Sequence, residues 1–499
     1  MAEHLIEIED AKTDLLACAA YIAENIKSAD GYAEVMKEIV PRYLDRGAVD
    51  LAAELANTVD DPFTRDRLLL RVAEKCAAAG DDEYAFQLVE AIEEHSTQNE
   101  AREHIAAQKS AQGDYAKAFE IANGLPHADY AFAEIAVRQA ADGDEASSLQ
   151  TIGKIDYPTA KVAALQNLAL LNLKKNDEAK AVELLDKAAQ SAVEIEFVEE
   201  KIRALLEVGS HYLEAKQNGK AVETFDQAKV SAETLDNVHR DSFLGSVALG
   251  FLQAGSLELA DRTLDLVGDN VQMSSTMVAF AREFWKRGET SEALETLEES
   301  YSILKSQRSG DVRDSKARFG LWAAIAVEFA RFEKPERAIE IAQEIAQESF
   351  YTSALNQIAQ ICAAQNKDDA ARQAVNAIGD DAQKMFALVG ISDAKNKSGN
   401  TVEAIKFLTE AETLAETVEQ LAVRSVAFNE LARRFQDYGN TEKMRELIFA
   451  NLDTIFSIRD ESDRAVALAQ MSDLYQSGNL ELVGTEREMI LRIIRKSEE

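Results

Sequence analysis

The chain has 499 residues, and its 89 acidic against 54 basic side chains give a net charge of −35. A field of this sign repels phosphate backbones, so nucleic acid is not an expected partner. Pro occurs 5 times and Gly 22 times, which is too few turn residues for a β-rich fold and favours helices joined by short loops.

The first residues and the cysteines indicate the compartment. The N-terminus carries acidic residues where a signal peptide needs positive charge, and no apolar run is long enough to span a membrane. Three cysteines (Cys18, Cys76 and Cys362) are too few for a disulfide framework and fit a reducing compartment. We therefore expect a cytoplasmic protein without a membrane span.

In chain order, residues 12–27 are expected to form an N-terminal packing helix, and one pattern then returns along the chain. It is a tight turn, often Gly followed by Asp, Asn, Glu or Ser, with a small residue, usually Ala, five positions later. The turns recur at intervals of 30 to 45 residues and predict a repeat architecture. The 13 predicted turns are Gly47, Gly80, Gly113, Gly143, Asn176, Lys216, Gly255, Gly288, Glu333, Asn366, Gly399, Gly439 and Gly478.

Two further positions recur at fixed distances before the turn. A small residue lies seven positions before it, as at Ala73 and Ala248, and an aromatic ring often lies four positions before it, as at Phe251 and Phe435. These two positions are three apart and so share one helix face, where the small residue lets a second helix approach closely. The turn residue can adopt the left-handed conformation that ends a helix.

This combination resembles the tetratricopeptide repeat, and the resemblance covers roughly residues 33 to 483. Trp322 lies where that family places its Trp. The resemblance implies an all-α fold, an α-solenoid superhelix of about 13 antiparallel helical hairpins of 30–40 residues each. The family's closing Pro is largely absent, and the repeat lengths vary, so the family's peptide-clamping residues cannot be transferred by position.

The spacing of the turns also predicts how the array is organised. Asn176 and Gly399, Lys216 and Gly439, and Gly255 and Gly478 are each 223 residues apart, which suggests a duplicated block. We expect one array over 1–305 with an N-terminal capping helix and another over 319–499 with a C-terminal one. The polar segment 306–318 is read as a loop and possible hinge, or as a surface insertion without a role. The amphipathic helix expected near the C-terminus caps the array or binds a membrane surface or a partner.

Motifs that carry chemistry are absent from the sequence. It contains no Gly-x-Gly, no Cys-x-x-Cys, no His-Glu-x-x-His and no Gly-x-Ser-x-Gly. Cys76 and Cys362 take the ring position of their repeats, which indicates core residues rather than reactive thiols. We therefore expect no enzyme activity, no cofactor and no metal site.

The resemblance implies a function in binding, because first helices line a concave groove in this family. The prediction is a non-catalytic scaffold or adaptor for a protein or peptide partner. The alternative is a regulatory or sensor subunit whose groove binds a signal peptide or a small ligand. If the family geometry holds, the candidate partner-binding residues are Arg67, Arg71, Glu74, Glu100, His104, Tyr130, Gln166 and Asn167.

Overall fold

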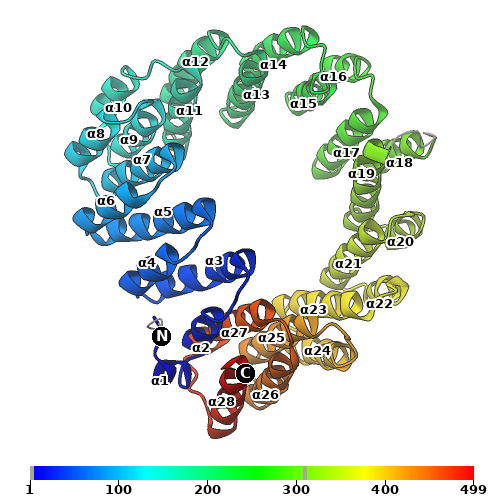
Figure 1. Ribbon diagram of the computed structural model, residues 1–499. Coiled ribbons are helices and arrows are strands. Elements are labelled where there is room, and N and C mark those ends of the chain that lie inside the picture. The colour runs from blue at the N-terminus through cyan, green and yellow to red at the C-terminus, as the bar shows by residue number, and fades with distance from the viewer. Residues whose placement is uncertain (1–4, 307–311, 499) are drawn as a thin grey trace. The chain divides into compact units, whose positions relative to one another are not determined.

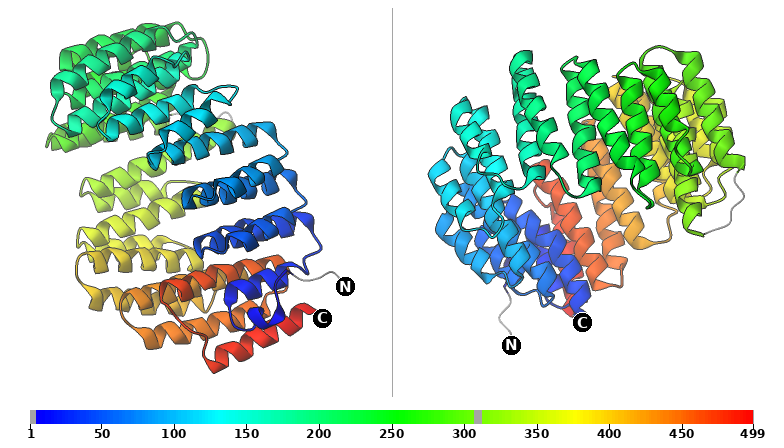
Figure 2. Two further views of the ribbon diagram at one scale, coloured as in Figure 1. Left: turned by 90° about the vertical axis from the view of Figure 1, so that its left-hand side faces the viewer. Right: turned by 90° about the horizontal axis from the view of Figure 1, so that it is seen from above.

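The computed structural model describes residues 5–306 and 312–498, which form 28 helices and no strand. From α3 (Ala29–Asp45) onward, a first helix, a tight turn and a second helix follow one another as antiparallel hairpins (Figure 1). Neighbouring helices run alongside each other in both views of Figure 2. The predicted all-α, tetratricopeptide-like solenoid fold is confirmed, and the number of 13 hairpins stays a prediction.

The left-handed residues of the described chain lie at the predicted turns. Thirteen residues have positive φ, and twelve of them are the turn residues expected from the sequence, from Gly47 (φ 78°) to Gly439 (φ 77°). The non-glycine turns Asn176, Lys216, Glu333 and Asn366 share this conformation. At these positions the chain ends one helix and starts the next.

The thirteenth turn corrects the prediction by one residue. Gly478 has φ −86° and is the C-cap of α27 (Glu461–Ser477), whereas Asn479 is left-handed with φ 48°. A Cβ at Gly478 would lie 2.0 Å from Nε2 of Gln436, so an alanine here would displace the Gln436 amide. Asn tolerates the left-handed region better than most residues and takes over the turn.

The predicted small and aromatic positions form the core between helices. Ala73 and Ala248 are fully buried, and so are the rings of Phe251 and Phe435. A Cβ at Gly209 would lie 2.3 Å from Cε1 of Phe225, which shows how closely α13 (Val198–Glu214) and α14 (Asn218–Glu233) approach. Burial of these small residues confirms the predicted packing.

The helices form two compact units. Unit 1 comprises residues 1–101 and 352–499, and unit 2 comprises residues 102–351. Their boundaries fall within α7 (His95–Ala111) and α21 (Glu348–Ala364). The predicted arrays over 1–305 and 319–499 divide the chain by repeat spacing, so their bounds differ from those of the two units. The duplication that they imply stays a prediction.

Unit 1 is built from both ends of the chain. Its N-terminal helices are α1 (Ile8–Ala11), α2 (Leu15–Ala23), α3, α4 (Val49–Asn57), α5 (Pro62–Ala79) and α6 (Asp82–Ala91). Its C-terminal helices are α22 (Asp368–Ala377), α23 (Asp381–Lys397), α24 (Thr401–Ala415), α25 (Leu421–Asp437), α26 (Thr441–Ser457), α27 and α28 (Gly484–Glu498).

Helix α2 joins the two ends of unit 1. All nine of its residues are buried, because it packs against α27, α28 and α3 (Figure 1). Its sequence is apolar on every side, which is typical of a helix covered all round. The expected N-terminal packing helix is therefore present, but it has no polar outer face.

Unit 2 is continuous in sequence. Its helices are α8 (Tyr115–Asn123), α9 (Asp129–Ala141), α10 (Glu145–Ile152), α11 (Pro158–Lys174), α12 (Glu178–Val193), α13, α14, α15 (Arg240–Gln253), α16 (Leu257–Leu264), α17 (Asn270–Lys286), α18 (Thr290–Ser306), α19 (Val312–Arg331) and α20 (Pro335–Gln343). Of the predicted polar loop over 306–318, Ser306 ends α18 and residues 312–318 belong to α19, which begins at Val312. Residues 307–311 lie outside the described part.

An aspartate near the N-terminal end of three first helices orders the loop that leads to the next repeat. Asp66, Asp129 and Asp241 each accept hydrogen bonds from two backbone N–H groups 27 and 28 residues later. The six N···O distances lie between 2.7 and 3.1 Å. A charged acceptor satisfies backbone donors that the loop leaves without a helical partner.

Two kinds of feature are absent from the residues that the structure describes. Over residues 5–306 and 312–498, no helix is both long and apolar enough to cross a membrane. Within the same ranges, no group of three or more His, Cys, Asp or Glu residues is placed to hold a metal ion. All three cysteines are buried and unpaired by disulfides.

Candidate functional site

The eight predicted partner-binding residues all lie on first helices. Arg67, Arg71 and Glu74 belong to α5, Glu100 and His104 to α7, Tyr130 to α9, and Gln166 and Asn167 to α11. Arg67, Arg71, Glu74 and Glu100 fall in unit 1 and the other four in unit 2.

Two of these residues form an ion pair with each other, and one other residue of the set is buried. Nη1 of Arg67 lies 2.7 Å from both carboxylate oxygens of Glu100. Gln166, in contrast, is only 5% exposed, so little of its side chain is accessible to a partner. Its neighbour Asn167 is exposed, because successive residues of a helix point about 100° apart.

A second first-helix surface, which the sequence reasoning did not select, lies in unit 1. Two hollows of about 480 and 470 Å³ occur along α21, α23, α25, α27 and α3, and both are lined by Glu430. We call this surface the Glu430 face. Its charged and amide side chains are Gln360, Asp393, Lys397, Asn429, Glu430, Arg433, Arg434, Gln470, Asp473 and Arg42.

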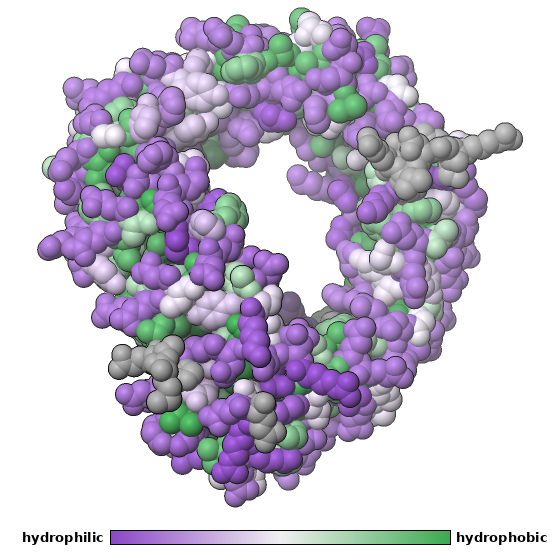
Figure 3. All heavy atoms as spheres, viewed as in Figure 1, coloured by the Kyte–Doolittle hydropathy of each residue, from purple (hydrophilic) through white to green (hydrophobic). Residues whose placement is uncertain are grey.

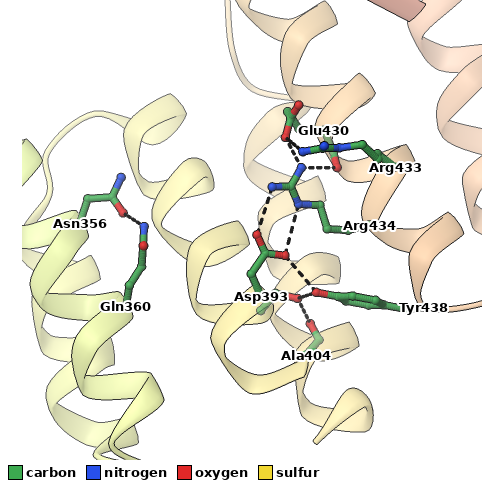
Figure 4. Close-up of polar contacts among 9 residues, drawn as sticks. Asn356, Gln360, Asp393, Ala404, Glu430, Arg433, Arg434 and Tyr438 are labelled. Atoms are coloured by element: carbon green, nitrogen blue, oxygen red, sulfur yellow. Dashed lines mark hydrogen bonds and ion pairs between the residues drawn. The ribbon is translucent and has the colours of Figure 1, made fainter. Parts of the chain in front are cut away.

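Ion pairs link the α23 and α25 parts of the Glu430 face (Figure 4). Arg434 donates from Nε and Nη2 to the two carboxylate oxygens of Asp393, at 3.3 and 3.1 Å. Arg434 also pairs through Nη1 with Glu430, and Glu430 accepts a 3.0 Å bond from Nη2 of Arg433. The hydroxyl of Tyr438 donates to Asp393 at 3.1 Å, so each charged group is held by at least one neighbour.

The α27 and α3 parts of the face carry a second pair of the same kind. Arg42 donates from Nε and Nη2 to the two oxygens of Asp473, both at 2.9 Å. Its Nη1 reaches the backbone oxygen of Glu38 at 2.7 Å and the Glu38 carboxylate at 2.6 Å. Two parallel N–H···O bonds fix both the position and the plane of a guanidinium group.

The electrostatic environment keeps both arginines charged. Burial alone would lower the pKa of Arg434, but its bonds to Asp393 and the charge of Glu430 outweigh burial and raise it. The pKa of Arg42 is raised in the same way, by Asp473 and Glu38 against the effect of burial. The face therefore presents fixed charges at any physiological pH.

The α21 part of the face is polar without being charged. Nε2 of Gln360 donates to Oδ1 of Asn356 at 2.7 Å (Figure 4). A Cβ at Gly390 would lie 2.3 Å from the same Nε2, so the glycine makes room for the Gln360 amide. Lys397 is exposed and lines the same hollow, where it adds a positive charge beside the Asp393–Arg434 pair.

The surface around these sites is mostly hydrophilic. In Figure 3 hydrophobic side chains appear only as small separate areas on the face that is drawn. This agrees with the 29% of charged residues in the sequence. The polar clusters described above are therefore the features that distinguish one part of the surface from another.

Comparisons with known proteins identify no family for this chain. No protein-family model matches the sequence, and no curated protein does. Solved structures with similar helical repeats include Ton1535 from Thermococcus onnurineus NA1, at 16% identity and a TM-score of 0.26, over 71% of this chain and 98% of that one.

Two further similar structures come from bacilli. The apo quorum sensor NprR from B. thuringiensis shares 12% identity over 65% of this chain and 96% of its own, with a TM-score of 0.25. Aspartyl phosphate phosphatase F from Bacillus subtilis shares 14% identity over 86% and 94%, with a TM-score of 0.29. At these low scores the similarity carries no argument about what the protein binds.

Proposed function

We propose that this protein is a non-catalytic, cytoplasmic scaffold or adaptor that binds a protein partner through first-helix surfaces. The observation that carries the proposal is the Glu430 face. Charged groups from successive first helices are held there in fixed positions beside two open hollows. A surface whose donors and acceptors are already positioned loses little conformational freedom on binding.

Lys397 and Arg433 are the groups of this face best suited to contact a partner. Lys397 is exposed, and the Arg433 side chain keeps 53% of its surface exposed while paired with Glu430. On a protein with a net charge of −35, these positive groups would favour a partner that places acidic side chains against them. They would disfavour a partner that places basic side chains there. Among the residues predicted from the sequence, the exposed Arg71, His104 and Asn167 are proposed as additional contacts.

Affinity capture from the native host tests the proposal. The tagged full-length chain is compared with the double variant Lys397→Glu/Arg433→Glu and with Lys406→Glu. Lys406 is exposed on the second helix α24 of the hairpin that contains Lys397, so its variant reverses one positive charge away from the face, where the double variant reverses two on it.

The expected result is a partner in near-stoichiometric amount that the wild type and Lys406→Glu capture equally and the double variant loses. Circular dichroism confirms that all three remain folded. If Lys406→Glu loses the partner to the same extent, the Glu430 face is not the binding surface. Turnover of any substrate by the purified chain would refute the non-catalytic part of the proposal.

A second candidate function is that of a regulatory or sensor subunit. It is favoured by the hollow of about 480 Å³ that Gln360, Asp393 and Arg434 line, a volume that fits a small ligand or a short peptide segment. The same captured complex distinguishes the two functions. Release of the partner by a small molecule or peptide from the host extract supports the sensor, and a complex that no extract fraction dissociates supports the scaffold.

A further inference from the structure

Aromatic side chains gather at the N-terminal ends of three first helices in unit 2. Tyr130 in the first turn of α9 is 51% exposed, and Phe197, the N-cap residue of α13, is 67% exposed. Tyr157, the N-cap residue of α11, is half-buried. The ring centroids of Tyr130 and Tyr157 lie 6.0 Å apart in an edge-to-face arrangement. Large aromatic side chains left exposed together mark an interaction surface more often than single ones do.

A carboxylate is fixed beside these rings. Oε2 of Glu200 accepts hydrogen bonds from the Tyr157 hydroxyl at 2.7 Å and from Oγ1 of Thr159 at 2.9 Å. Both bonds go to the same oxygen, so Oε1 keeps its capacity to accept from another molecule. Phe197 lies three residues before Glu200, at the N-cap of the same helix.

The neighbouring cations are directed elsewhere. Nζ of Lys154 lies 4.4 Å from the centroid of the Phe119 ring, and Arg203 pairs with Glu199 at 3.6 Å and lies over the Phe243 ring. Glu199 and Glu200 stand in the first turn of α13, where their charge offsets the positive end of the helix dipole. The rings and the Glu200 carboxylate therefore form a negative, aromatic surface that no described cation of this chain fills.

We propose that Tyr130, Tyr157, Phe197 and Glu200 form a recognition site for an arginine side chain on a segment of a partner protein. A guanidinium group is planar, so it can donate to Oε1 of Glu200 while it lies against an aromatic ring. A phosphate backbone does not suit the site, because the carboxylate would repel it. We call this arrangement the Glu200 site. It rests on the proposed function in assuming a protein partner, but it lies on a different surface from the Glu430 face.

The experiment measures binding of a fluorescein-labelled nona-arginine peptide to the full chain by fluorescence anisotropy, at physiological salt. Glu200→Gln removes the charge but keeps an oxygen that can accept from Tyr157 and Thr159. Phe197→Ala removes a ring without changing charge. The matched controls are Glu207→Gln, at an exposed acid on the same helix, and Phe449→Ala, at a 45% exposed ring on α26.

We expect Phe197→Ala to weaken binding about 3- to 10-fold, the range of a cation–π contact. Glu200→Gln should weaken it by at least as much, and both controls should bind like the wild type. Nona-lysine should bind more weakly than nona-arginine, because an ammonium group cannot combine ring contact with a planar fork of donors. Circular dichroism of each variant should match the wild type.

Three results would overturn the proposal. Equal weakening by Glu207→Gln and Glu200→Gln, or an unchanged Kd for Phe197→Ala, would mean that the peptide responds only to the general negative charge. Tighter binding of a labelled oligothymidylate than of nona-arginine would assign the rings to base stacking instead. Each of these results can occur while Lys397→Glu/Arg433→Glu still loses the captured partner, so the Glu200 site can fail without the Glu430 face failing.

Discussion

Arg42 and Asp473 stand 431 residues apart in sequence and yet form an ion pair through two bonds of 2.9 Å. Arg42 lies five residues before the left-handed turn at Gly47, and Asp473 lies six residues before the one at Asn479. The two residues therefore occupy defined places in their repeats.

Arg434 and Asp393 hold the same two places in consecutive repeats. Arg434 lies five residues before Gly439, and Asp393 lies six before Gly399. The N-terminal hairpin of unit 1 thus meets the last hairpin as the next repeat of the array would, although the chain between them is hundreds of residues long.

The first prediction compares the two ion pairs by double-mutant cycles. Arg42→Met with Asp473→Asn, and Arg434→Met with Asp393→Asn, should each give a coupling free energy of about 0.5–1 kcal/mol, the range of partly exposed pairs. Urea unfolding followed by circular dichroism measures the four single and the two double variants. No coupling between Arg42 and Asp473, beside a normal value for the other pair, would show that the ends of the chain do not meet as a repeat junction.

The second prediction tests the left-handed turns. Gly80 has φ 87° and a Cβ there would touch nothing, so Gly80→Ala should lower the free energy of unfolding by about 1–2 kcal/mol through backbone strain alone. Gly219 also has open space around it, but it lies in α14 with ordinary helical φ. Gly219→Ala should be neutral or stabilise by roughly 0.5 kcal/mol. Equal effects of the two variants in urea unfolding would contradict the turn assignment.

The third prediction concerns a close contact between two helices of unit 2. A methyl group at Gly209 would lie within 3 Å of three atoms of the fully buried Phe225 ring, so Gly209→Ala should cost about 1–3 kcal/mol by overpacking. Phe225→Leu removes the obstructing ring atoms at a cost of its own. The double variant should be more stable than the sum of the two single effects by about 1 kcal/mol or more, as seen in thermal unfolding. Strict additivity would mean that the two residues do not meet.

The fourth prediction concerns the cysteines. Burial raises the pKa of Cys76 to about 11, helped by the negative charges of Asp81 and Asp50. Burial also raises the pKa of Cys18, with Asp14 adding to the effect and Arg464 opposing it. Because the thiolate is the reactive form, Ellman's reagent at pH 8 should label none of the three native cysteines quickly and all three in guanidinium chloride. Rapid labelling of one native thiol would identify it as accessible rather than as a core residue.

The repeat units could be read from the sequence because their determinants are local. The residue that must be left-handed sets the turn at Gly80 or Gly399. The buried position of Ala248 follows from its distance to the next turn. The shift from Gly478 to Asn479 escaped prediction, because glycine is the usual left-handed residue and here the turn falls on the Asn that follows it.

The sites were harder to predict, since they depend on which residues of separate hairpins meet. Asp393 and Arg434 are 41 residues apart, and neither is unusual in a chain that is 29% charged. Of the residues chosen from the family geometry, only Tyr130 became part of a proposed recognition cluster, and Gln166 is buried. The spacing of Asp and Arg before consecutive turns is a signal that could have found the Asp393–Arg434 pair.

The division of the chain between the two units also determines which parts can fold while the chain is being synthesised. Unit 2 is one stretch, residues 102–351, so all of its helices can pack as soon as they leave the ribosome. Helix α2 is among the first segments made, yet part of the surface that buries it belongs to α27 and α28, among the last. Until translation is nearly complete, the nine apolar residues of α2 lack this part of their native cover, and a nascent chain stalled before residue 461 should expose them to chaperones.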